Sequence, residues 1–114
     1  VMQPDDIPKV QAAAAKVIVE PKIIHYISSI VARTRQWHAV SVGSSPRGGI
    51  NMLVAARTMA ACYARNYVIP DDIKLIARWV LRHRLILRPE AEIEGVTADQ
   101  VVAEILDAVE VPRS

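Results

Sequence analysis

The residues Ser45-Pro46-Arg47 combine a pattern typical of a helix start with a cation. Serine is a favoured N-cap and proline is favoured in the first turn, so a helix is predicted to begin at residue 46. Arg47 would then lie where the helix dipole and the free backbone N–H groups favour an anion over a cation. In one interpretation, an anion in front of the helix is bound by these N–H groups and by the Arg47 guanidinium. In the other, Arg47 is a solvated arginine that costs about a few tenths of a kcal/mol.

Two features near Arg47 bear on this choice. Gly48 and Gly49 would keep the approach to the helix start clear of side chains. Arg35 follows Thr34 at the expected end of the preceding helix, where the dipole favours basic residues for structural reasons alone. Arg35 is therefore open to two interpretations, contact with a ligand or structural support.

Other catalytic chemistry is missing from the sequence. The chain contains no G-x-x-x-x-G-K-[ST] loop to bind phosphates and no apolar strand ending in Asp-Glu to hold magnesium. His25, His38 and His83 fall in separate expected elements without ligand spacing, and the single cysteine excludes a thiolate cluster. We therefore expect no metal site and no independent ATP hydrolysis.

The elements that must position these residues are about five amphipathic helices with little or no sheet, which is an all-α bundle. The first is expected from residue 5 or 6 to about 17, the second from 21 to about 35, and the third from 46 to about 65. The fourth begins at Pro70, and the last follows the capping-box pair Thr97 and Gln100. Residues 36–43 are expected to form a connector without a long element.

Apolar spacing also predicts which helix faces are buried. The expected inner stripe of the second helix is Ile23, Ile24, Ile27, Ile30 and Val31. The expected inner residues of the third helix are Ile50, Leu53, Val54, Ala61 and Ala64, and Asn66 is expected to end that helix in a left-handed conformation.

Composition limits the class of protein. The chain has 114 residues, of which 52% are hydrophobic, so it suits one folded domain and is short for a complete nucleotide hydrolase. A net charge of +2 is too small to indicate nucleic acid or membrane binding by itself. No apolar run is long enough to span a bilayer, and a single cysteine fits a reducing, cytoplasmic setting.

Ordered segments across the chain resemble the lid region of MoxR-type AAA+ ATPases. Residues 42–48 (VGSSPRG) are similar to the family's GaSPRa signature, and residues 34–35 (TR) to the ATR ending of its preceding helix. Residues 67–73 (YVIPDDI), 80–85 (VLRHRL) and 109–112 (VEVP) are similar to its YVtPdDV, VLrHRl and v.vP segments. Ser44 departs from an alanine-like position of the pattern, and a small non-glycine residue is usual near Gly48 or Gly49.

This resemblance implies that residues 1–114 form one helical lid, whose α/β ATP-binding core is absent from the chain. Arg47 matches the sensor-2 arginine that reaches the nucleotide phosphates, and Ser45, Pro46, Gly48 and Arg35 would lie near the nucleotide. The implied cofactor is ATP with magnesium held by the core, and the lid alone would be inactive. The implied partners are its own core, neighbouring subunits of a ring and von Willebrand factor A domain proteins, in chaperone-like work on protein complexes.

Two other functions stay open on the residues alone. Lys74, Arg78 and Arg82, with Arg84 nearby, form an expected basic face that a stand-alone module would use for nucleic acid or an acidic protein. The bundle would otherwise serve only structure or oligomerisation. Salt-dependent binding of DNA would favour the first of these alternatives.

Overall fold

The computed structural model describes residues 16–112, which form five helices and two short strands. The helices are α2 (Pro21–Gln36), α3 (Pro46–Cys62), α4 (Pro70–Leu81), α5 (Pro89–Ile93) and α6 (Ala98–Ala108). Four of them, α2 to α5, begin with proline, whose fixed φ suits the first turn and whose missing N–H costs no hydrogen bond there. The expected all-α bundle is confirmed; the expected first helix lies mostly outside the described residues.

The only sheet within residues 16–112 is a two-stranded antiparallel ribbon of β1 (Val40–Val42) and β2 (Ile86–Leu87). Its first strand, β1, lies in the connector of residues 36–43, where no long element was expected. A separate parallel bridge joins Ile18 to Tyr67, with the Ile18 N–H donating to the Asn66 carbonyl at 2.8 Å. The stretch at residue 18 is therefore extended, as β-branched side chains favour.

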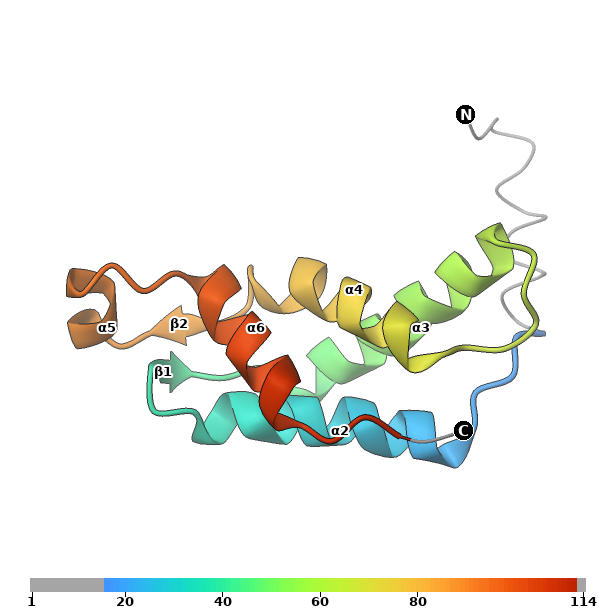
Figure 1. Cartoon of the computed structure of the whole chain (residues 1–114), viewed down its shortest axis with the longest axis horizontal. Coiled ribbons are helices and arrows are strands. Elements are labelled where there is room, and N and C mark those ends of the chain that lie inside the picture. The colour runs from blue at the N-terminus through green and yellow to red at the C-terminus, as the bar shows by residue number, and fades with distance from the viewer. Residues whose placement is uncertain (1–15, 113–114) are drawn as a thin grey trace.

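The core lies between α2, α3, α4 and α6, and Figure 1 shows the last turns of α6 in front of α2. Its largest fully buried apolar side chains are Tyr26, Ile23, Ile30, Met52, Ile73, Leu81, Ile105, Val101 and Val102. The capping box that begins α6 is present: Gln100 N–H donates to Thr97 Oγ1 at 3.2 Å, and Thr97 N–H donates to Gln100 Oε1 at 3.0 Å.

The inward face of α3 is not the one predicted. The buried residues are Gly48, Met52, Ala56 and Ala60, whereas Ile50 and Val54 are exposed and Leu53 and Ala61 are half-buried. The helix is apolar on most sides, so hydrophobicity alone does not fix its rotation. Its small residues face inward because they allow α3 to pack closely on its neighbours.

The end of α3 also differs from expectation. The left-handed residue is Ala64, with φ 59°, and not Asn66. The Arg65 N–H closes the turn on the Ala60 carbonyl at 2.9 Å, a bond of the type that ends helices. Because the chain leaves the helix before residue 65, the Arg65 side chain can reach Asp72 at the start of α4.

Candidate functional site

The turn before α3 is fixed to the end of α2 by the buried Thr34. The Thr34 hydroxyl donates to the Val31 carbonyl at 2.6 Å and accepts from the Ser44 N–H at 2.9 Å. Arg35 Nε donates to the Ser44 carbonyl at 3.0 Å. The Thr34-Arg35 pair therefore sets the place at which α3 begins, and Arg35 has a structural contact whatever else it binds.

Gly43 makes this approach possible. A Cβ at Gly43 would lie 2.7 Å from the backbone N and Cα of Arg35. Such a distance is well inside van der Waals contact, and the atoms it meets are backbone atoms that cannot rotate away. Glycine is therefore required here so that the two backbones can pass in contact.

Ser45 is the N-cap residue of α3 by position, with extended φ and ψ of −78° and 166°. Its side chain makes no capping hydrogen bond, which corrects the expectation that the hydroxyl fixes the helix start. The Gly48 N–H instead donates to the Ser45 carbonyl at 2.9 Å, so the backbone supplies the bond that a serine cap would give.

Ser44 and Gly48 share one small space. A Cβ at Gly48 would overlap the Ser44 Oγ, and the Ser44 hydroxyl donates to the Ser45 carbonyl at 3.0 Å. The Ser44 hydroxyl therefore occupies the space that a methyl group on residue 48 would need. A serine at residue 44 and a glycine at residue 48 fit together for this reason.

Arg47 is exposed in the first turn of α3, and no described residue makes a hydrogen bond or ion pair with it. The structure also brings Arg84 to this turn, with its Cδ 3.6 Å from the position of a Cβ on Gly48. Arg84 was assigned to a basic face by its position near residue 82, and only its folded position reveals this contact. Arg35, Arg47 and Arg84 thus border the start of α3, which makes this end of the helix attractive to an anion.

An apolar groove of about 320 Å³ lies between α2 and α3 and reaches Arg35 and Pro46 at the helix start. Its apolar walls are Ile24, Ile27, Val31, Ile50 and Leu53. Ile24 is 48% exposed and Ile50 is 61% exposed, although both were predicted to be inward. Two of the side chains that depart from the predicted burial, Ile24 and Ile50, therefore line a groove that reaches the start of α3.

The basic face of α4 is partly neutralised. Arg82 Nε lies 3.8 Å from an oxygen of Asp99, and its guanidinium carbon lies 5.9 Å from the centroid of the Trp79 ring. Lys74 is half-buried and Arg78 is exposed. The face therefore presents less free positive charge than the sequence pattern implies.

Within residues 16–112, no group of three or more His, Cys, Asp or Glu side chains is placed to hold a metal ion. In the same part of the chain, no helix combines the length and apolarity needed to cross a membrane.

Comparison with known proteins bears on this geometry. The family model described as "AAA lid domain" matches residues 32–105, a span that contains the Thr34-Arg35 pair, the turn before α3 and Arg84. A crystal structure of a "putative ATPase" from Cytophaga hutchinsonii superposes with a TM-score of 0.88 at 32% identity. The match covers 96% of this chain and 36% of that one.

Curated relatives match over nearly the full chain. The chain is 43% identical over 112 residues to the uncharacterized protein YeaC of Bacillus subtilis, covering 98% of this chain and 35% of YeaC. It is 30% identical over 124 residues to "Chaperone MoxR1" of Mycobacterium tuberculosis, covering 99% of this chain and 32% of that protein. The chain therefore spans about a third of the length of these relatives.

Proposed function

Because this chain belongs to the AAA lid domain family and is a lid of the MoxR type, we propose that it closes over ATP bound by an α/β core. In this proposal, closure couples ATP hydrolysis to chaperone-like remodelling or activation of protein complexes. The core supplies the phosphate loop and the magnesium ligands, since the chain has neither motif.

The observation that supports this role most strongly is the exposed Arg47 beside a rigidly positioned helix start. Ser44 donates its N–H to the Thr34 hydroxyl and accepts from Arg35 Nε, and these two bonds hold the turn against α2, so the backbone N–H groups of the first turn keep a fixed direction. A phosphate in front of this turn would meet those donors and a guanidinium able to bind two oxygens. Preorganised donors of this kind stabilise charge without having to reorient during the reaction.

The other site residues have secondary roles in the proposal. Pro46 and Ser45 begin the helix, and Gly48 leaves the surface beside Arg47 without a side chain of its own. Arg35 supports the turn through its Nε and lies at the end of the apolar groove. The groove would receive the uncharged base of the nucleotide, whereas Arg47 faces the phosphates.

The proposed partners rest on membership of the family and not on a contact in the structure. We propose that the lid works with its own core and with neighbouring subunits of a ring, and that von Willebrand factor A domain proteins are among the partners. A cytoplasmic location fits the single cysteine of the chain.

The test is the ATPase activity of this lid joined to an AAA+ core. Arg47→Ala should lower kcat/KM about a hundredfold, or roughly 3 kcal/mol of transition-state stabilisation, as removal of one preorganised donor does in other sites. Arg47→Lys should restore only part of the activity, because an ammonium lacks the planar fork. Arg78→Ala, at an exposed arginine on α4, is the matched control and should change the rate little. Equal turnover in the Arg47→Ala and Arg78→Ala proteins would refute the role of Arg47.

A further inference from the structure

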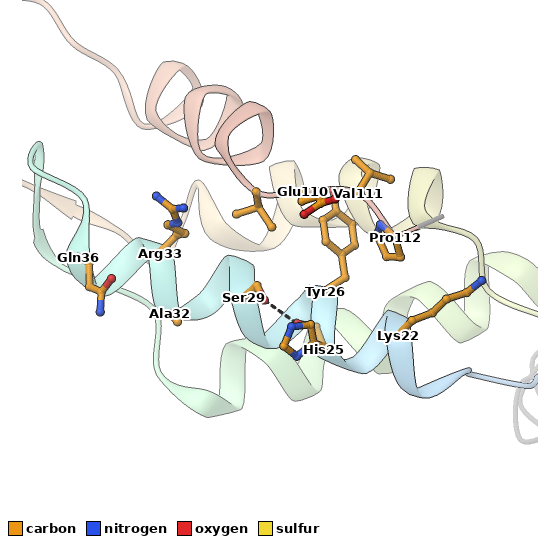
Figure 2. Close-up of a pocket in the computed structure, with 11 residues that line it drawn as sticks. Lys22, His25, Tyr26, Ser29, Ala32, Arg33, Gln36, Glu110, Val111 and Pro112 are labelled. Atoms are coloured by element: carbon orange, nitrogen blue, oxygen red, sulfur yellow. Dashed lines mark hydrogen bonds between the residues drawn. The ribbon is translucent and has the colours of Figure 1, made fainter. Parts of the chain in front are cut away.

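Cations on the surface of this domain differ in whether a carboxylate accompanies them. Lys22 lies 3.3 Å from Glu20 at the start of α2. Arg33 lines a groove of about 590 Å³ between α2 and residues 109–112, and Figure 2 shows Glu110 in the same groove. These cations share their surroundings with a carboxylate, so they do not by themselves indicate an anionic ligand.

Two arginines at the start of α3 have no such carboxylate. Arg47 and Arg84 are both exposed, and neither side chain makes a hydrogen bond or an ion pair with a described residue. The segments that carry them, residues 43–49 and 83–88, contain no Asp or Glu. Two guanidinium groups at the positive end of a helix dipole repel each other, and an anion close to both would reverse this repulsion.

The ribbon of β1 and β2 brings Arg84 to this helix start. Val42 in β1 pairs with Ile86 in β2, and the two strands are antiparallel. From that pair, one strand continues into the turn before α3, and the other leads back to Leu85 and Arg84. Leu85 is buried, whereas Arg84 beside it is exposed. Strand pairing therefore places an exposed arginine next to the turn that begins α3.

The aliphatic stem of Arg84 packs on the first turn of α3. Its Cδ lies 3.6 Å from the position of a Cβ on Gly48, and Gly48 is buried although the adjacent Arg47 is exposed. The Arg84 backbone is held by the bond from its N–H to the Leu81 carbonyl, at 2.9 Å. A packed stem leaves the guanidinium free for a ligand. It also reduces the side-chain entropy that would be lost when a ligand binds.

We propose that Arg84 supplies a second guanidinium to the nucleotide phosphates, beside Arg47. This inference rests on the proposed closure of the lid over ATP. Arg47 belongs to the helix and Arg84 to the segment before β2, so two different elements of the lid would contact one anion. A triphosphate has enough oxygens for two guanidinium groups, each of which can bind two of them. The position of Arg84 depends on the fold, so the sequence motif around Arg47 does not reveal it.

Substitutions that keep the stem separate a phosphate contact from packing on Gly48. In the lid joined to an AAA+ core, Arg84→Met should lower kcat/KM for ATP about tenfold, because methionine keeps an apolar stem and lacks the charged donors. Arg84→Lys should recover part of this loss, because it keeps the charge without the planar fork. Arg78→Ala removes an exposed charge on α4 and should change the rate little. Urea unfolding should show the same stability for Arg84→Met as for the unchanged chain.

Binding of this chain to a separate AAA+ core distinguishes phosphate from an acidic protein surface. Arg84→Met should weaken binding about tenfold when the core holds a non-hydrolysable ATP analogue, and should leave binding to the empty core unchanged. Equal weakening in the two cases overturns the proposal, because Arg84 would then contact the core itself. Full ATPase activity of Arg84→Met also overturns it. If Arg47→Ala lowers the activity and Arg84→Met does not, only the role of Arg84 fails; if neither does, the nucleotide role of the lid fails as well.

Discussion

At the residue scale, Ser44 and Gly48 show how the helix start tolerates a departure from its family pattern. The resemblance has an alanine-like residue where this chain has Ser44, and usually a small non-glycine residue near Gly48 or Gly49. Taken separately, a serine is a neutral change, whereas a glycine in the first turn weakens the helix. In the structure the Ser44 Oγ lies where a Cβ on residue 48 would be, so the two residues depend on each other.

This dependence predicts a specific double-mutant cycle. Gly48→Ala should lower the free energy of unfolding by about 1–3 kcal/mol, because the new methyl group overpacks the site and displaces the Ser44 hydroxyl from its bond to Ser45. Ser44→Ala/Gly48→Ala should recover most of that loss, giving a coupling of about 1 kcal/mol or more in urea unfolding. Gly49→Ala is the control, since its Cβ would meet only methyl groups of Val31 and Ile27 at 3.3 and 3.4 Å. Additive effects of the two substitutions would contradict the shared space.

At the element scale, the sequence predicts helix starts better than helix rotation. Proline in the first turn and the Thr97–Gln100 pair correctly place the starts of α2, α3, α4 and α6. These signals act within the first turn of each helix, so they do not depend on how the helices pack together. The buried face of α3 depends instead on which side can approach the other helices most closely, which a largely apolar sequence leaves undetermined.

The junction of α3 and α4 depends on one buried carboxylate. Asp72 accepts from both terminal nitrogens of Arg65, at 2.8 and 2.7 Å, and from the Ile69 N–H at 3.0 Å. Its side chain is 4% exposed, so the ion pair is largely shielded from solvent. The carboxylate thus joins the residue that ends the α3 turn to the first turn of α4.

Asp72→Asn should therefore lower the free energy of unfolding by about 2–4 kcal/mol, because an amide cannot accept all three bonds and leaves Arg65 without its counter-charge. Urea unfolding followed by circular dichroism measures the change. Asp99→Asn, at the exposed pair with Arg82, should cost less than about 0.5 kcal/mol. Similar losses in the two variants would show that the Asp72 pair contributes no more than a surface pair.

At the scale of the whole molecule, α2 separates two surfaces of different character. Ile24, Ile27 and Val31 face the apolar groove that leads to the start of α3, whereas Lys22, His25 and Arg33 face a second groove, between α2 and residues 109–112. The sequence motif indicated Arg47, but neither groove was predicted, because each is built by segments far apart in the chain. The position of Arg84 beside the start of α3 was not predicted for the same reason.

Exposed apolar side chains near the start of α3 fit the proposed closure over a core. Ile24 and Ile50 are large apolar side chains that are exposed, and both line the apolar groove that leads to the start of α3. Covering this surface with a nucleotide-loaded core would bury apolar area at the same time as the guanidinium meets phosphate. Closure would then depend on the nucleotide through both contributions.

The most direct test of the nucleotide-facing lid is NMR of this chain, isotopically labelled, during titration with an unlabelled AAA+ core. With a non-hydrolysable ATP analogue on the core, signals should shift at the Ser44–Gly49 amides, at Arg47 Nε and at the methyl groups of Ile24 and Ile50. Without nucleotide these shifts should be much weaker, and Arg47→Ala should remove most of the nucleotide dependence. A loaded core that binds the chain but leaves the start of α3 unperturbed would contradict the account.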